Sequence, residues 1–298
     1  MPSATGLFHK AVVLRAGELD KLQSMPWKDF YAIAIKAQQA LARESGPGGG
    51  LMRGFSPVVD GAILPQHPYD PEAAPTAANV PMVISSVENE MSMSWADASL
   101  ESITMPQVVE RLKTRAGFGG GFGDKAGEVV EAYAKAFPGR KPVEIWTLAS
   151  SNRQGVVALA DVKSKQPAGV YVNWFTWQPP LFDGRIRAFH CVDISFWFYN
   201  TDLMLTLTGG GARPRAVSAK MAGALLQFMK TGDPNGPGLP NWPKYTAAKG
   251  ETVNLRRHLC GEERSRPRGA QSASRADVAV ESAVHHTRIR QASNEVLP

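Results

Sequence analysis

An α/β fold is predicted for the first 255 residues of this 298-residue chain. Apolar, β-branched runs that suit buried strands alternate along it with segments whose apolar residues recur at helical spacing. Hydrophobic residues make up 43% and charged residues 20% of the sequence, which is the composition of a globular chain able to bury a core. No apolar run reaches the roughly 18 residues that a membrane-spanning helix needs, so no membrane span is expected.

The first predicted element is a helix that follows Pro26. Ser24 is placed to cap its N-terminus, because a serine hydroxyl can accept hydrogen bonds from backbone N–H groups of the first helical turn. Apolar residues within W-K-D-F-Y-A-I-A-I-K-A-Q-Q-A-L-A-R then share one helical face: Phe30, Ala34, Ala37 and Leu41.

Two buried strands are predicted next along the chain. They are V-P-M-V-I-S-S-V (80–87) and G-V-Y-V-N-W-F-T-W (169–177), both rich in β-branched or aromatic residues. Two helices are expected between them, over 106–116 and 125–137, and the second ends before Pro138. Strands separated by helices favour a sheet of the α/β class.

A last helix is predicted before the amino-acid composition changes near residue 256. Its apolar face is formed by Val217, Met221, Leu225 and Phe228. Gly232 suits the left-handed backbone at a helix C-terminus, and Pro234 beyond it cannot continue a helix.

The segment 256–298 differs from residues 1–255 and marks the predicted domain boundary. It has no aromatic residue, and its basic residues are all arginine. Such a composition indicates disorder, since little of it can be buried. A frame-shifted translation explains the abrupt change near Leu255 equally well, and the sequence does not separate the two explanations.

No cofactor, metal or nucleic-acid site is predicted. The glycine-rich segments lack both the G-K-[ST] of a P-loop and the strand-turn-helix setting of a dinucleotide fingerprint. The histidines before residue 256, His9, His67 and His190, do not share a metal-ligand spacing. The net charge of +6 divides into +3 on residues 1–255 (25 Lys+Arg against 22 Asp+Glu) and +3 on residues 256–298 (8 against 5), and this arginine-rich end offers no aromatic residue for base stacking.

A carboxylate and a histidine follow the two predicted strands. Glu90 comes just after 80–87, and His190 follows 169–177 by a loop. Histidine next to an orienting carboxylate is the arrangement of a general base, and the chain order acid, then histidine is that of α/β-hydrolases. The order predicts an acid–base pair in acyl transfer.

Four ordered segments are similar to the C-terminal half of the type-B carboxylesterases, the cholinesterase-like family of α/β-hydrolases. The last of them, R-A-F-H-C-V-D-I-S-F-W-F, resembles the family's catalytic-histidine segment, and V-P-M-V-I-S-S-V-E-N-E resembles its acid turn. The other two are G-L-F-H-K-A-V-V (6–13) and F-S-P-V-V-D-G-A-I-L-P (55–65). The resemblance implies a partial α/β-hydrolase fold, namely the C-terminal half of the mixed sheet with its flanking helices.

The resemblance also implies roles for individual residues. Glu90 matches the triad acid, His190 the triad base, and Asp193 a carboxylate that supports the local hydrogen-bond network. Carboxylic esters are the implied substrates of the family. Three aromatic side chains of the second strand segment are expected near an acyl pocket: Trp174, Phe175 and Trp177.

The nucleophile serine of this family has no counterpart here. The sequence contains no G-x-S-x-G elbow and no H-G-G-G oxyanion loop. We therefore expect a chain truncated at its N-terminus, from an incomplete gene model, a gene fragment or a pseudogene, and without serine-esterase turnover of its own. A non-catalytic binding module of cholinesterase-like fold is the alternative.

The start of the sequence carries two further expectations. Residues 9–14 would form an apolar sheet edge through which the chain could associate. The first residues lack the basic and apolar regions of a signal peptide, and the sequence assigns no compartment.

Overall fold

The computed structural model describes residues 21–44, 59, 61, 64–117, 119–239 and 241–255. The segment 6–13, the expected sheet edge 9–14 and the predicted tail 256–298 lie outside these residues, and the segment 55–65 is described only in part. The chain divides into two compact units. One comprises Met1–Pro75 with Phe118–Gly120, and the other comprises Thr76–Gly117 with Gly121–Pro298.

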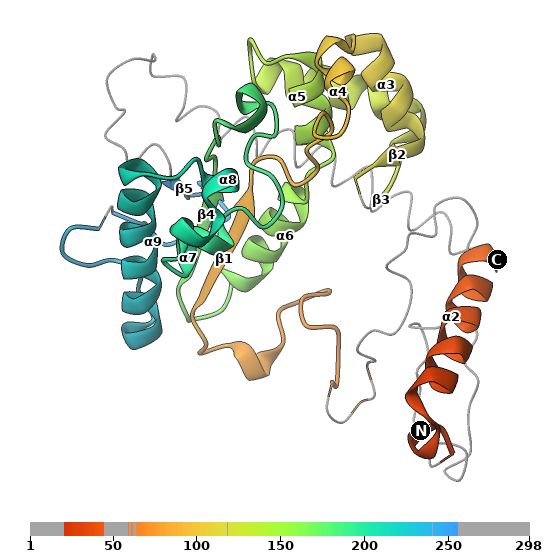
Figure 1. Ribbon diagram of the computed structural model, residues 1–298. Coiled ribbons are helices and arrows are strands. Elements are labelled where there is room, and N and C mark those ends of the chain that lie inside the picture. The colour runs from red at the N-terminus through yellow and green to blue at the C-terminus, as the bar shows by residue number, and fades with distance from the viewer. Residues whose placement is uncertain are drawn as a thin grey trace. The chain divides into compact units, whose positions relative to one another are not determined.

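The first unit contains helix α2 (Trp27–Glu44), which confirms the predicted helix (Figure 1). Asp29 lies in its first turn, where a negative charge is favourable near the positive end of the helix dipole. The expected apolar face is not a buried one, since Phe30 is 39% exposed.

A parallel three-stranded sheet forms the centre of the second unit (Figure 1). Its strands are β1 (Met82–Val87), β4 (Val170–Phe175) and β5 (Thr252–Asn254), in the order β1-β4-β5. Met82 lies opposite Val170, and Val172 lies opposite Thr252. Both predicted strands are thus confirmed, each slightly shorter than expected, whereas β5 was not predicted. In the described part of the sheet, β1 and β5 are the edge strands.

Helix α6 (Arg153–Lys163) packs against β1 and β4. Ile84 and Val172 from the strands meet Val156 and Ala160 from the helix in a buried apolar cluster. Burial of these side chains attaches the helix to one face of the sheet.

Helices α7 (Ile194–Trp197) and α9 (Ala212–Thr231) pack against each other, and their side chains join the core formed by the other face of the sheet. Phe175 of β4 contacts Phe196 of α7, with ring centroids 5.0 Å apart. The predicted end of α9 is confirmed, because Gly232 adopts the left-handed backbone (φ 76°) and its N–H donates to the carbonyl of Phe228 at 2.7 Å.

Three further helices pack on one another and form a separate helical layer: α3 (Met105–Thr114), α4 (Ala126–Ala136) and α5 (Pro142–Ala149). The first two confirm predicted helices. The residues Val108, Leu112, Val143 and Ile145 of this layer are each 0% exposed.

The remaining elements are short. They are the strands β2 (Arg115–Ala116) and β3 (Gly119–Gly120), the helix α8 (Leu205–Thr208), and the 3₁₀ turns η1 (Pro75–Ala77), η2 (Ala98–Ser102), η3 (Gly123–Lys125), η4 (Leu181–Gly184) and η5 (Thr201–Met204). None of the described helices is long and apolar enough to cross a bilayer.

Candidate active site

The chain segments after β1 and before α7 meet beyond the carboxyl ends of the strands. Glu88 extends the ladder of β1, since its N–H donates to the carbonyl of Phe175 at 2.9 Å. Asn89 then forms a parallel bridge with Phe189. The residue that follows each bridge partner is Glu90 on one segment and His190 on the other. The sheet therefore brings the two predicted site residues to the same place.

His190 and Glu90 form a hydrogen bond. The imidazole Nδ1 lies 2.6 Å from the carboxylate Oε2 of Glu90. A carboxylate only accepts hydrogen bonds, so in the neutral imidazole that makes this bond Nδ1 carries the proton and Nε2 has a free lone pair. The His190 side chain is 64% exposed while that of Glu90 is 18% exposed, so the pair presents its imidazole to solvent. Glu88, the other acid of this turn, forms an ion pair with Arg140.

Asp193 does not bond to His190 in the described structure but anchors α7 to the sheet. Its Oδ2 accepts hydrogen bonds from Ser85 Oγ and from Trp197 Nε1, each at 3.2 Å. Ser85 Oγ is also 3.0 Å from Oδ1 of Asn173 on β4. These hydrogen bonds link β1, β4 and α7 through Ser85 and Asp193.

A network of buried and partly buried charges adjoins the two segments that carry the pair, and sequence reasoning did not identify it. Arg140 pairs with Glu88 and, at 2.7 Å, with Glu144. Arg187 makes two hydrogen bonds to Glu101, of 3.0 and 3.1 Å, and its Nε lies 3.5 Å from Glu144. Glu88 precedes Glu90 by two residues and Arg187 precedes His190 by three, so both segments of the site join one network.

The network holds its charges in their ionised forms. Burial alone would raise the pKa of the Glu101 carboxyl, but hydrogen bonds from Arg187, Ser94 and Lys141 lower this pKa to about 2. Burial would likewise lower the pKa of Arg140, yet the carboxylates of Glu88 and Glu144 raise it. Each buried charge therefore has an opposite partner.

The backbone around His190 departs from ordinary conformations. Arg187 has φ 52° and Cys191 has φ 69°, although neither residue is glycine. Such left-handed conformations cost free energy and persist where surrounding contacts impose them, which is common at functional sites. The sequence R-I-R-A-F-H-C contains no glycine that would have signalled these turns.

Two of the three aromatic residues expected at an acyl pocket belong to the core instead. Phe175 is 0% and Trp177 is 3% exposed, and both rings contact Phe196. The Trp177 Nε1–H donates to the carbonyl of Thr208 at 3.0 Å, which satisfies its buried polar group. Trp174 is partly buried and stacks under the guanidinium of Arg153, 5.0 Å from the ring centroid. Phe175 lies on a covered face of β4, and Trp177 lies two residues beyond the strand in the same buried cluster.

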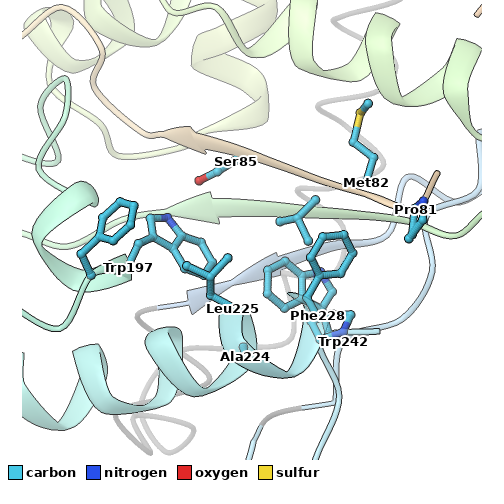
Figure 2. A pocket seen from close by; sticks show the side chains of 11 residues that line it. Pro81, Met82, Ser85, Trp197, Ala224, Leu225, Phe228 and Trp242 are labelled. Atoms are coloured by element: carbon cyan, nitrogen blue, oxygen red, sulfur yellow. The ribbon is translucent and has the colours of Figure 1, made fainter. Parts of the chain in front are cut away.

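An apolar cavity of about 460 Å³ lies on the α9 side of β1. Figure 2 shows Leu225 and Phe228 projecting from α9 toward the strands, with Met82 and Pro81 at one end. Ser85, the residue bonded to Asp193, contributes a hydroxyl to its wall. No group of three or more metal-ligating side chains occurs in the described part of the chain.

Comparisons with known proteins show that this chain is similar to carboxylesterases. The model of the carboxylesterase family matches residues 141–274. The chain is 26% identical over 242 residues to phenmedipham hydrolase of Pseudarthrobacter oxydans, covering 77% of this chain and 45% of that protein. It is 31% identical over 103 residues to carboxylesterase 5A of Felis catus, covering 32% of this chain and 19% of that protein.

Solved structures of esterases share the fold. An esterase from Clostridium hathewayi that can hydrolyze aliphatic aromatic polyesters aligns with a TM-score of 0.61 and 25% identity, covering 82% of this chain and 46% of that one. A PNB esterase aligns with a TM-score of 0.53 and 23% identity, covering 81% of this chain and 47% of that one. These matches support a partial carboxylesterase-family chain, and the solved structures share its α/β-hydrolase fold; the chain spans about half the length of the similar esterases.

Proposed function

We propose that this chain carries the acid–base half of a serine carboxylesterase, with His190 as the general base and Glu90 as its orienting acid. The hydrogen bond of 2.6 Å between His190 Nδ1 and Glu90 Oε2 is the observation that carries the proposal. Carboxylic esters are the proposed substrates, because the family match and the similar esterases are enzymes of that class.

The geometry supports a defined sequence of proton movements. Glu90 accepts the hydrogen bond that the Nδ1–H of His190 donates, and so directs the Nε2 lone pair outward. Nε2 takes the proton of a serine hydroxyl as that oxygen attacks the ester carbonyl, and the Glu90 carboxylate stabilises the resulting imidazolium. The imidazolium returns the proton to the leaving alcohol. Water repeats the cycle on the acyl-serine and releases the acid.

The serine and the oxyanion donors are proposed to come from polypeptide outside this sequence. The chain contains no G-x-S-x-G elbow and aligns with only 46% of the Clostridium hathewayi esterase. Loss of the nucleophile lowers kcat by a factor on the order of 10⁶ in a serine hydrolase. We therefore expect the chain by itself to have no serine-esterase turnover.

Asp193 is proposed to support the base indirectly. By accepting hydrogen bonds from Ser85 and Trp197 it fixes the start of α7, three residues after His190. A carboxylate at this place limits movement of the histidine segment without taking part in proton transfer.

The test is a segment exchange in the Clostridium hathewayi esterase. The aligned part of that enzyme is replaced by this chain, and hydrolysis of p-nitrophenyl acetate is followed in chimeras that unfold cooperatively. Turnover is expected, and His190→Ala should reduce it by a factor on the order of 10⁴ or more. A folded chimera whose turnover is unchanged by His190→Ala contradicts the proposed base.

The isolated chain provides the complementary measurement. No burst of p-nitrophenol is expected from it, and a burst abolished by His190→Ala would show that the chain is a complete esterase. The non-catalytic alternative is favoured by one observation, namely the three buried apolar clusters of the second unit. It requires a folded chimera that shows no His190-dependent hydrolysis.

A further inference from the structure

We infer that Asn89 is a positioning residue that sets the register between Glu90 and His190. The inference rests on the proposed role of that pair and adds a residue to it. Asn89 does not touch reacting atoms, and it acts through the two segments that deliver the acid and the base.

Two hydrogen bonds join Asn89 to Ala188 on the histidine segment. The backbone N–H of Asn89 donates to the carbonyl of Ala188 at 2.9 Å. In return, the backbone N–H of Ala188 donates to the side-chain Oδ1 of Asn89 at 3.3 Å. The second bond depends on the side chain, so only a residue with an acceptor at this position can make it.

The bridge between Asn89 and Phe189 fixes which residues come next. In a parallel pair, neighbouring positions advance together along both segments, so Glu90 and His190 leave the bridge side by side. A slip by one residue would move each side chain to the opposite face and separate the carboxylate from the imidazole. The reciprocal bonds to Ala188 oppose such a slip.

Burial shows why the register matters for this pair. Asn89 is 1% and Ala188 is 0% exposed, whereas the His190 side chain is 64% exposed. The imidazole itself therefore receives little packing, and its position depends on the residues just before it. Phe189, packed edge-on against Trp95 at 5.0 Å, anchors the same segment.

The buried charge network does not replace this contact. Its member Glu88 pairs with Arg140, just before α5, while Arg187 bonds to Glu101 of η2 and lies near Glu144 of α5. The bonds from Asn89 to Ala188 are direct links between the acid and histidine segments, one residue before Glu90 and two before His190.

The test is the tautomer of His190 in the full chain. Histidine labelled with ¹⁵N reports whether Nδ1 or Nε2 carries the proton, and His190→Gln identifies the signal among the six histidines. The unaltered chain should show the Nδ1–H form. Asn89→Ala should cause loss of that form, because a displaced imidazole no longer donates to Glu90. Asn89→Asp, which retains an acceptor oxygen, should preserve it.

Ser92→Ala is the matched control. Ser92 Oγ donates to the carbonyl of Ile186 at 2.7 Å and so links the same two segments, but farther from the pair. This variant should leave the Nδ1–H form intact. Asn89→Gln, which moves the amide outward by one methylene, repeats the Asn89→Ala test if the alanine variant does not fold.

The outcomes separate the two proposals. A folded Asn89→Ala or Asn89→Gln chain with the full Nδ1–H signal overturns the role of Asn89 and leaves the pair intact. Equal loss of the signal in Ser92→Ala also overturns it, since any link between the segments would then suffice. Absence of the Nδ1–H form in the unaltered chain counts against the proposed acid–base pair itself.

Discussion

The helical layer of α3, α4 and α5 and the two site segments, 88–94 and 185–193, are held together by different forces. In the layer, Val108, Leu112 and Ile145 are 0% exposed and pack against other apolar side chains. In the site segments, the buried residues include Glu88 and Arg187, which are held by ion pairs. Both regions are buried, yet the core of the layer is apolar, whereas the site segments combine buried apolar residues such as Ile186 and Val192 with paired charges.

The difference shows what each force can specify. Apolar burial stabilises in proportion to area and depends little on direction, so it suits the packing of whole helices. Hydrogen bonds between charged groups depend strongly on distance and angle, so they fix the positions of individual atoms. The Glu90–His190 pair, which needs a defined geometry, lies in the region with directional contacts.

The largest loss of unfolding free energy is expected from Arg187→Ala, which removes a cation from the charge network. Glu101 would lose its bidentate partner and keep only Lys141 as a cation, and Glu144 would lose a nearby cation and keep only Arg140, so both partly buried carboxylates would be less well compensated. Removing one partner of a buried ion pair typically costs about 3–5 kcal/mol of unfolding free energy. Urea unfolding followed by circular dichroism measures the change.

Arg185→Ala is the matched control for that prediction. Arg185 lies on the same segment but donates to backbone carbonyls of Ser94 and Trp95 rather than to a carboxylate. A loss of roughly 1 kcal/mol is expected, the usual value of such a hydrogen bond. Equal destabilisation by the two variants would show that the ion pairs add nothing particular to the site segments.

A somewhat smaller effect is expected from Leu112→Ala in the helical layer. Leu112 is 0% exposed, and its truncation leaves a cavity that costs about 2–5 kcal/mol, with about 3 kcal/mol as the central expectation. Because Leu112 lies in the apolar cluster and not in the charge network, the folded variant should keep the Nδ1–H form of His190. Leu226→Ala, at a side chain that is 55% exposed, should change the unfolding free energy little. Loss of the Nδ1–H form in folded Leu112→Ala would contradict the contrast between the regions.

The same contrast explains which elements the sequence predicts. Helices α3 and α4 show one apolar stripe, and β1 and β4 are apolar runs, so periodicity identifies all four. Helix α5 is buried on nearly every side, and α6 buries polar residues such as Arg153 and Lys163, so neither shows a clear stripe. With only three residues, β5 is too short to carry a period.

The site likewise contains residues that the sequence predicts and contacts that it does not. Glu90 and His190 are predictable because each follows a predicted strand in an order typical of α/β-hydrolases. The pairing of Glu88 with Arg140 joins residues 52 positions apart, and no local pattern indicates it. The burial of Phe175 and Trp177 was also missed, since an aromatic strand residue can face either a pocket or a core. Directional, long-range contacts leave no periodic signal in a sequence.

Acid titration of Glu101 should produce the smallest effect and reports on the charged region alone. Its pKa of about 2 in the folded protein lies below the ordinary value of 4.5, so the unfolded chain binds the proton more readily. The stabilisation is therefore present above pH 4.5 and is lost as the pH falls toward 2. After allowance for solvent screening of this partly exposed group, we expect about 1–2 kcal/mol.

Glu101→Gln isolates this contribution, because other carboxylates titrate in both chains over the same range. The variant should be less stable at neutral pH, since Arg187 loses a charged partner. Between pH 4.5 and 2, however, its urea midpoint should fall less steeply than that of the unaltered chain. Parallel curves would mean that Glu101 is not held ionised by Arg187, Ser94 and Lys141. A difference in slope confined to this window would instead attribute the acid sensitivity to the ion pairs of the two site segments, and not to the apolar helical layer.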